Sequence, residues 1–130
     1  MKNPVVHFEM PYEDQTRVAK FYKNVFGWEM NQMGKDMGEY ITAATAETDE
    51  KRMVKTPGTI NGGFFKRAKP DQGVSVVISV NDIQKAMKDI AVAGGKVRGE
   101  PVEIPGIGTY ASFTDTEGNH VSMLQPMQGK

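Results

Sequence analysis

Apolar and polar side chains alternate along residues 4–10, which predicts a β-strand. One side of this strand is apolar, and the other carries His7 and Glu9. From Asp14 to Gly27 the apolar residues recur at intervals of three and four, which predicts an amphipathic helix. Asp14 is a favourable N-cap, and Gly27 is a favourable C-terminal stop. The apolar stripe of the helix consists of Val18, Phe21, Tyr22, Val25 and Phe26.

Three further strands are expected in the first half of the chain. The long polar segment 46–58 separates the last two, and we expect it to be an exposed, mobile loop. A Gly62-Gly63 pair interrupts the third strand and predicts a bulge or a close backbone approach. The charged segment 66–73 is the best candidate for a linker. The expected strands cover residues 28–33, 39–45 and 59–67.

The same order of elements begins again after this linker. Residues 74–80 are apolar and β-branched, which predicts a strand. Asn81 or Asp82 then caps a second amphipathic helix that stops at Gly94-Gly95. Its apolar stripe consists of Ile83, Ala86, Met87, Ile90 and Ala91. Three more strands are expected at residues 96–102, 109–114 and 120–125.

Matching positions indicate that the two halves are copies of one unit. Pro11 and Ser79 begin the two strand-to-helix junctions and lie 68 positions apart, and 13 positions separate the helix cap from the glycine stop in both halves. We therefore expect an α+β fold of two βαβββ modules in one domain, residues 1–130. Module one should cover about residues 1–68 and module two about residues 69–130. Pairing the modules would bury both sheet faces and leave a concave surface between them.

Charge and composition exclude several classes of protein. Lys and Arg number 16, and so do Asp and Glu, so the net charge is zero and nucleic acid is not an expected partner. No apolar run approaches the length of a membrane-spanning helix, and the N-terminus lacks a signal-peptide pattern. The absence of cysteine removes disulfides, thiolate metal sites and cysteine nucleophiles. We expect a cytoplasmic protein that does not bind membranes.

Three segments together carry a resemblance to a known family. They are residues 5–11, residues 21–28 with the sequence Phe-Tyr-Lys-Asn-Val-Phe-Gly-Trp, and the closing hairpin 108–119. In these segments the chain resembles the vicinal-oxygen-chelate proteins, which include glyoxalase I, bleomycin-resistance proteins and extradiol dioxygenases. Within that superfamily it is most similar to the lactoylglutathione lyase-related branch, where Ile60–Phe65 also fits. The resemblance covers nearly the whole chain and implies the glyoxalase/bleomycin-resistance/dioxygenase fold.

The resemblance also implies a divalent metal such as Zn, Ni, Mn or Fe. In the family His, Glu or Gln ligands come from the first and last strands of each module. Carried over by position, the first ligand falls on His7, and the others fall on segment 61–63, Ser75 and Ser122. Only His7 is a strong ligand. We therefore expect a degenerate metal site and no resident cofactor, with a divalent metal only if the site is retained.

His7 and Glu9 are the candidates for catalysis because they share one strand face. The pKa of histidine is ordinarily near 6.5, so His7 can act as a base or hydrogen-bond donor. The alternative is a structural His7 bonded to a neighbour such as Ser75 or Ser122, and for Glu9 a solvated carboxylate. His120 is expected to be exposed. The candidate pocket residues are Tyr40, Gly63, Ser75, Tyr110 and Ser122, with core packing as the alternative for the two tyrosines.

Three functional hypotheses follow. The leading one is a glyoxalase-like protein that binds a small molecule in the cleft between modules without chemistry, as bleomycin-resistance proteins do. The second is a metal-dependent lyase, isomerase or dioxygenase related to lactoylglutathione lyase, using His7. The third is a structural or regulatory dimer. Small family members commonly pair, so we expect a homodimer.

Overall fold

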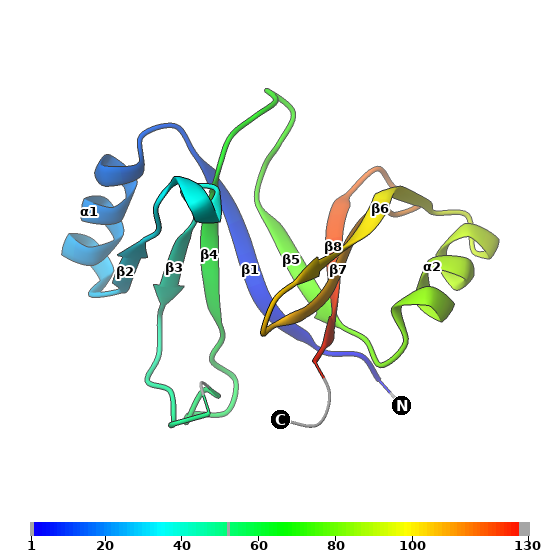
Figure 1. Cartoon of the computed structure of the whole chain (residues 1–130), viewed down its shortest axis with the longest axis horizontal. Coiled ribbons are helices and arrows are strands. Elements are labelled where there is room, and N and C mark those ends of the chain that lie inside the picture. Colours follow the sequence, from blue (N-terminus) through cyan, green and yellow to red (C-terminus); the bar gives the residue numbers. More distant parts are fainter. Residues whose placement is uncertain (1, 52, 128–130) are drawn as a thin grey trace. The chain divides into compact units, whose positions relative to one another are not determined.

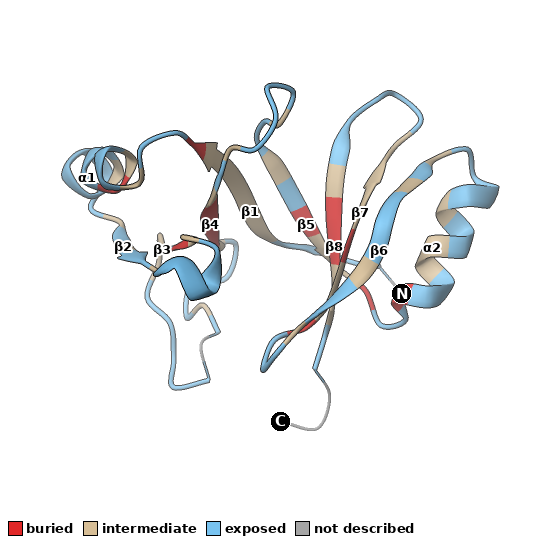
Figure 2. Cartoon of the chain, turned by 45° about the horizontal axis from the view of Figure 1, so that its top comes forward, coloured by how far each residue is buried: buried red, intermediate tan, exposed pale blue. Residues whose placement is uncertain are grey.

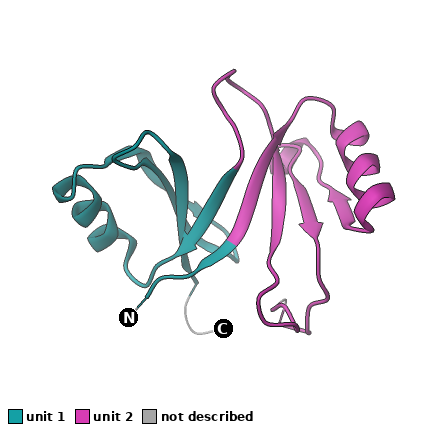
Figure 3. Ribbon diagram, turned by 180° about the vertical axis from the view of Figure 1, so that it is seen from behind, with its two compact units in different colours: residues 1–6, 75–130 teal, residues 7–74 magenta. Residues whose placement is uncertain are grey.

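The structure is a computed structural model that describes residues 2–51 and 53–127 (Figure 1). Within these residues the order of elements is βαβββ, given twice, with a short 3-10 helix, η1 (Lys35–Met37), inside the first copy. The chain divides into two compact units, which Figure 3 colours separately. Unit 2 comprises residues 7–74, and unit 1 comprises residues 1–6 with 75–130. The predicted α+β class and repeated βαβββ order are confirmed.

Unit 2 contains a sheet in the spatial order β2-β3-β4-β1. β1 runs parallel to β4, and the other neighbours are antiparallel. β3 begins later than predicted because Glu39 adopts a left-handed φ of 57° and ends the turn after η1. The elements are β1 (Val5–Tyr12), α1 (Gln15–Phe26), β2 (Glu29–Gln32), β3 (Ile41–Ala44) and β4 (Asn61–Lys66).

α1 packs on one face of this sheet. The buried core beneath it consists of Tyr12, Ala19, Ile41, Ala43 and Phe64 (Figure 2). The predicted apolar stripe is only partly buried, since Val18 and Tyr22 pack against this core. Phe21, Val25 and Phe26 of the stripe are instead 54%, 57% and 60% exposed. Ala19 is the α1 residue that is buried against the sheet. Because side chains project from a helix at fixed angles, Phe21 and Val25 then lie on the side of α1 that faces away from the sheet.

Unit 1 repeats this plan with the spatial order β5-β8-β7-β6. Its helix covers one face through Ile83, whose core partners are Val80, Ala111 and Met123. The predicted helix stripe is confirmed except for Ala91, which is exposed. The β6–β7 register shifts between Arg98 and Val102, which marks a bulge. The elements are β5 (Ser75–Ser79), α2 (Ile83–Val92), β6 (Lys96–Ile104), β7 (Gly108–Thr114) and β8 (His120–Pro126).

Both helices begin at an aspartate, as predicted. The Asp14 carboxylate accepts a hydrogen bond from Arg17 N at 3.0 Å, and Asp82 accepts one from Lys85 N at 3.0 Å. Gly27 ends α1 with a left-handed φ of 73°, and its N–H donates to the carbonyl of Lys23. Neither helix in the described part of the chain is long and apolar enough to cross a membrane.

The segment between β3 and β4 has more internal structure than its polar composition indicates. Thr48 and Val54 form an isolated antiparallel bridge. Between them the Asp49 carboxylate accepts hydrogen bonds from the backbone N–H groups of Lys51 at 2.8 Å and Met53 at 3.0 Å. Aspartate side chains commonly organise turns in this way. The segment is a small closed turn, exposed as predicted.

Candidate functional site

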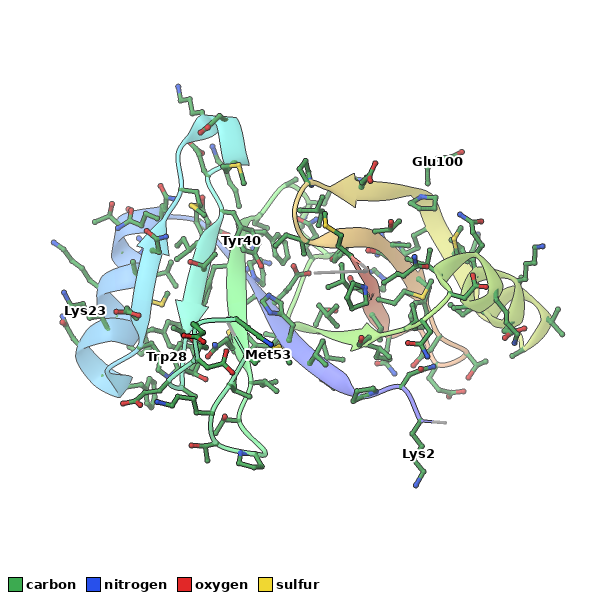
Figure 4. The ribbon with its side chains drawn as sticks, turned by 60° about the horizontal axis from the view of Figure 1, so that its bottom comes forward. Lys2, Lys23, Trp28, Tyr40, Met53 and Glu100 are labelled. Atoms are coloured by element: carbon green, nitrogen blue, oxygen red, sulfur yellow. The ribbon has the colours of Figure 1, made fainter. Side chains whose placement is uncertain are left out.

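The face of the unit 2 sheet opposite α1 holds several of the residues that the sequence predicts as candidates for the site. Phe8 packs against the α1 core, so the alternation along β1 places His7 and Glu9 on the other face. The β1–β4 register sets Glu9 opposite Gly63. Tyr40 immediately precedes β3, and its place beside β4 is labelled in Figure 4. Four of the residues predicted as site candidates therefore share this face, namely His7, Glu9, Tyr40 and Gly63.

The Tyr40 hydroxyl joins His7 to Glu9. It donates to Glu9 Oε2 at 3.3 Å and lies 3.3 Å from His7 Nε2. A hydroxyl has one proton, so when Tyr40 donates to Glu9 it accepts the N–H of His7 Nε2. The neutral imidazole then keeps Nδ1 as an acceptor. The hydrogen-bond neighbour of His7 in this His7–Tyr40–Glu9 cluster is Tyr40 rather than Ser75 or Ser122, and Glu9 accepts a hydrogen bond from the same hydroxyl.

Gly63 makes this arrangement possible. A Cβ at Gly63 would overlap the Tyr40 hydroxyl, so the tyrosine crosses β4 only because no side chain stands there. On the other face, a Cβ at Gly62 would lie 2.5 Å from the Phe8 ring. The glycine pair was predicted to mark a bulge or a close backbone approach. That prediction is wrong, because the β1–β4 register is regular here and the close neighbours are aromatic side chains.

Burial determines the charge of His7. It lowers the pKa of the imidazole below the ordinary 6.5, because a low-dielectric environment disfavours the charged form. Burial therefore favours the neutral form of the His7 imidazole. A neutral imidazole beside a carboxylate and a phenol can accept or donate hydrogen bonds and relay a proton, which suits recognition of a polar molecule.

The remaining predicted pocket residues belong to unit 1. Ser122 is buried, and its Oγ lies 2.6 Å from the Tyr110 hydroxyl and 3.2 Å from Ser112 Oγ. Ser75 donates instead to the carbonyl of His120 at 3.0 Å. Ser112 was not among the predicted pocket residues, and the β7–β8 register places it directly opposite Ser122. Counting outward from the 115–119 turn would have found this pair.

The positions that correspond to the family's metal ligands do not fit a divalent metal. Across residues 2–51 and 53–127 there is no group of three or more His, Asp or Glu side chains that could hold one. The Asn61 amide oxygen is committed, since it accepts from Thr45 N at 2.8 Å and Ala46 N at 3.1 Å. Ser122 bonds to other hydroxyls. His7 and Glu9 alone provide fewer donors than protein metal sites use.

Two βαβββ units, each with a helix on one sheet face and polar groups on the other, define a protein of the vicinal-oxygen-chelate type. The sequence profile of the Glyoxalase/Bleomycin resistance protein/Dioxygenase superfamily matches residues 5–123, and the chain belongs to this superfamily. The family resemblance predicted from the sequence is thus confirmed.

Two curated relatives carry glyoxalase names. A glyoxylase-like domain-containing protein from Didymella fabae is 27% identical over 124 residues, which cover 91% of each chain. A probable chloroplastic lactoylglutathione lyase from Arabidopsis thaliana is 29% identical over 108 residues, 82% of this chain. The match spans only 31% of the Arabidopsis protein.

One solved structure illustrates the shared fold. It is a methylmalonyl-CoA epimerase from Streptomyces coelicolor in complex with 2-nitronate-propionyl-CoA. The TM-score is 0.70 with 14% sequence identity, and the alignment covers 100% of this chain and 99% of the epimerase. At this identity the likeness concerns the fold alone.

Proposed function

We propose that this protein is a glyoxalase-like binder that holds a small polar molecule at the His7–Tyr40–Glu9 cluster without a divalent metal. The observation that carries the proposal is the position of the Tyr40 hydroxyl, 3.3 Å from both His7 Nε2 and Glu9 Oε2. In a metal site of this superfamily, imidazole and carboxylate would be ligands. Here they hydrogen-bond to a phenol.

The cluster favours a ligand with hydroxyl or amide donors. His7 Nδ1 and the Glu9 carboxylate are acceptors, and the Tyr40 ring adds an apolar surface beside them. A sugar-like or amide-bearing compound would match these groups, with specificity set by hydrogen bonds.

Elemental analysis tests the metal-free part of this proposal. The purified protein would be dialysed against Zn²⁺, Ni²⁺, Mn²⁺ or Fe²⁺ and compared with His7→Ala. We expect no near-stoichiometric metal in either protein. Stoichiometric metal in the natural chain that disappears in His7→Ala would overturn the proposal.

A thermal-shift screen tests the binding part. Polar compounds that raise the melting temperature of the natural chain should lose that effect in Tyr40→Phe, which removes only the joining hydroxyl. Tyr22→Phe is the matched control, because Tyr22 packs in the α1 core of unit 2. Ligands that stabilise both variants equally would place binding elsewhere.

A second candidate function is a metal-dependent lyase or isomerase, with dioxygenase chemistry as a further variant. The glyoxalase names of the relatives favour it, together with the two donors His7 and Glu9 on one face. Lactoylglutathione lyase activity after metal loading, abolished by His7→Ala, would support it. Its absence would leave the binding function.

We also propose a cytoplasmic homodimer. The cysteine-free composition suits a reducing compartment, and closed symmetric dimers are the commonest assemblies of small proteins. Light scattering across a dilution series measures the mass of the particle. A monomer at micromolar concentration would contradict this assignment.

A further inference from the structure

The face of the unit 1 sheet opposite α2 carries a concentration of cationic and hydroxyl side chains. Ala111 and Met123 pack in the α2 core, so the residues that alternate with them point to the other face. The strand registers arrange these residues in two rows across β6, β7 and β8. One row is Lys96, Thr114 and His120, and the next is Arg98, Ser112 and Ser122.

Arg98 and His120 meet at the β6 side of these rows. Arg98 Nη1 lies 2.7 Å from His120 Nδ1, and both side chains are exposed. A guanidinium can only donate, so Nδ1 accepts and the ring proton of His120 lies on Nε2. Both groups are therefore hydrogen-bond donors toward any molecule that approaches them.

The cations of this face are not held in ion pairs in the part of the chain that the structure describes. Neither Lys96 nor Arg98 forms an ion pair there. Glu100 is on the same strand, but it lies in the bulge, is exposed, and projects away from the strand in Figure 4. The imidazole that Arg98 contacts carries no negative charge, so this contact leaves the guanidinium a net cation.

We propose that this Arg98–His120 face binds the oxyanion group, phosphate or carboxylate, of a small ligand. The planar guanidinium fork matches two oxygens of such a group, and charged hydrogen bonds of this kind are the strong ones. Lys96 adds a second positive charge two residues away on the same strand face. Thr114 and Ser112 place hydroxyls between the cations and β8. Its residues belong to unit 1, whereas those of the His7–Tyr40–Glu9 cluster belong to unit 2.

NMR titration of the full chain tests this site, with inorganic phosphate and acetate as separate probes at constant ionic strength. We expect saturable shifts of the backbone amides of residues 96–98, 112–114 and 120–122. Arg98→Gln should weaken the binding about tenfold, since it removes a charged hydrogen-bonding group. Arg17→Gln is the matched control, because it removes the same charge from α1. Stronger binding of phosphate would indicate a phosphorylated ligand, and stronger binding of acetate a carboxylated one.

Two further measurements keep the test independent of folding. Arg98→Lys retains the charge but loses the fork, so it should bind more tightly than Arg98→Gln and less tightly than the natural chain. Each variant must also keep its melting temperature, as expected for an exposed residue. Unsaturable shifts with both anions would overturn the proposal. So would equal weakening by Arg17→Gln and Arg98→Gln.

Discussion

The Tyr40 hydroxyl reaches His7 Nε2, at 3.3 Å, by passing over Gly63, the residue whose side chain would stand in its way. β4 lies between β3 and β1 in the sheet, so a side chain entering from the β3 side must cross a whole strand to contact His7. Because Gly63 has no Cβ, His7 and Tyr40 can contact each other although they are 33 positions apart in the sequence.

Gly63→Ala should move Tyr40 and destabilise the fold. The added methyl group overlaps the hydroxyl, so the tyrosine must leave His7 and Glu9, at a cost of about 1–3 kcal/mol in the free energy of unfolding. Urea denaturation measures this. Gly73→Ala is the control, because nothing lies within 4 Å of its added methyl, and it should change stability by less than about 0.5 kcal/mol. Equal effects of the two substitutions would contradict this role of Gly63.

Acid should weaken the fold through His7. Burial lowers its pKa in the folded state below the ordinary 6.5, so below that pH the unfolded chain binds more protons than the folded one. This contribution to stability is present above pH 6.5 and is lost as the pH falls toward the folded-state pKa. The slope cannot exceed about 1.4 kcal/mol per pH unit for one proton.

Unfolding curves between pH 7.5 and about pH 4.5 measure the His7 effect. His7→Gln should flatten the pH dependence relative to the natural chain. A slope that survives in His7→Gln would assign it to carboxylates instead.

Alkali should weaken the fold through Tyr12. Its buried hydroxyl donates to the Glu39 carbonyl, and burial together with the Glu39 charge raises its pKa above the ordinary 10.0. As the pH rises past 10.0 the unfolded chain releases this proton first, so stability falls. Tyr12→Phe should lose about 1–2 kcal/mol at neutral pH and also lack this alkaline decline. Tyr22→Phe should cost less, because the Tyr22 hydroxyl donates a weak hydrogen bond to Met10 Sδ at 3.7 Å.

The exposed flank of α1 should tolerate substitution where the core does not. Phe64 is 1% exposed, so Phe64→Ala should cost about 3–5 kcal/mol. Phe21 is 54% exposed, and Phe21→Ala should cost less than about 1 kcal/mol. Both values come from the same urea denaturation experiment. A large loss in Phe21→Ala would show that this flank is covered in solution.

The sequence predicted both helices well, because caps, stops and apolar periodicity act over only a few neighbouring residues. Asp14 and Gly27 act on neighbouring backbone groups, so their roles follow from sequence position. Which part of the α1 stripe is buried depends on how closely Ala19 approaches the sheet, and that depends on strands far along the chain. The exposure of Phe21 and Val25 therefore does not follow from the apolar periodicity alone.

The sequence predicted which residues are candidates for the site, but not which of them contact one another. Alternation along β1 placed His7 and Glu9 together, since period two is intrinsic to a strand. The Tyr40 link required the β3–β4 register, which no short motif encodes. The Arg98–His120 contact depends in the same way on three strands pairing across the bulge and the 115–119 turn.

The bulge in β6 has a consequence for association. β6 is the outer strand of the unit 1 sheet, where unpaired backbone groups could template a strand from another molecule. Between Arg98 and Val102 the register breaks, and Pro101 has no N–H to offer. The row of backbone donors along this edge is therefore interrupted, which disfavours the pairing of a long strand from another molecule with β6.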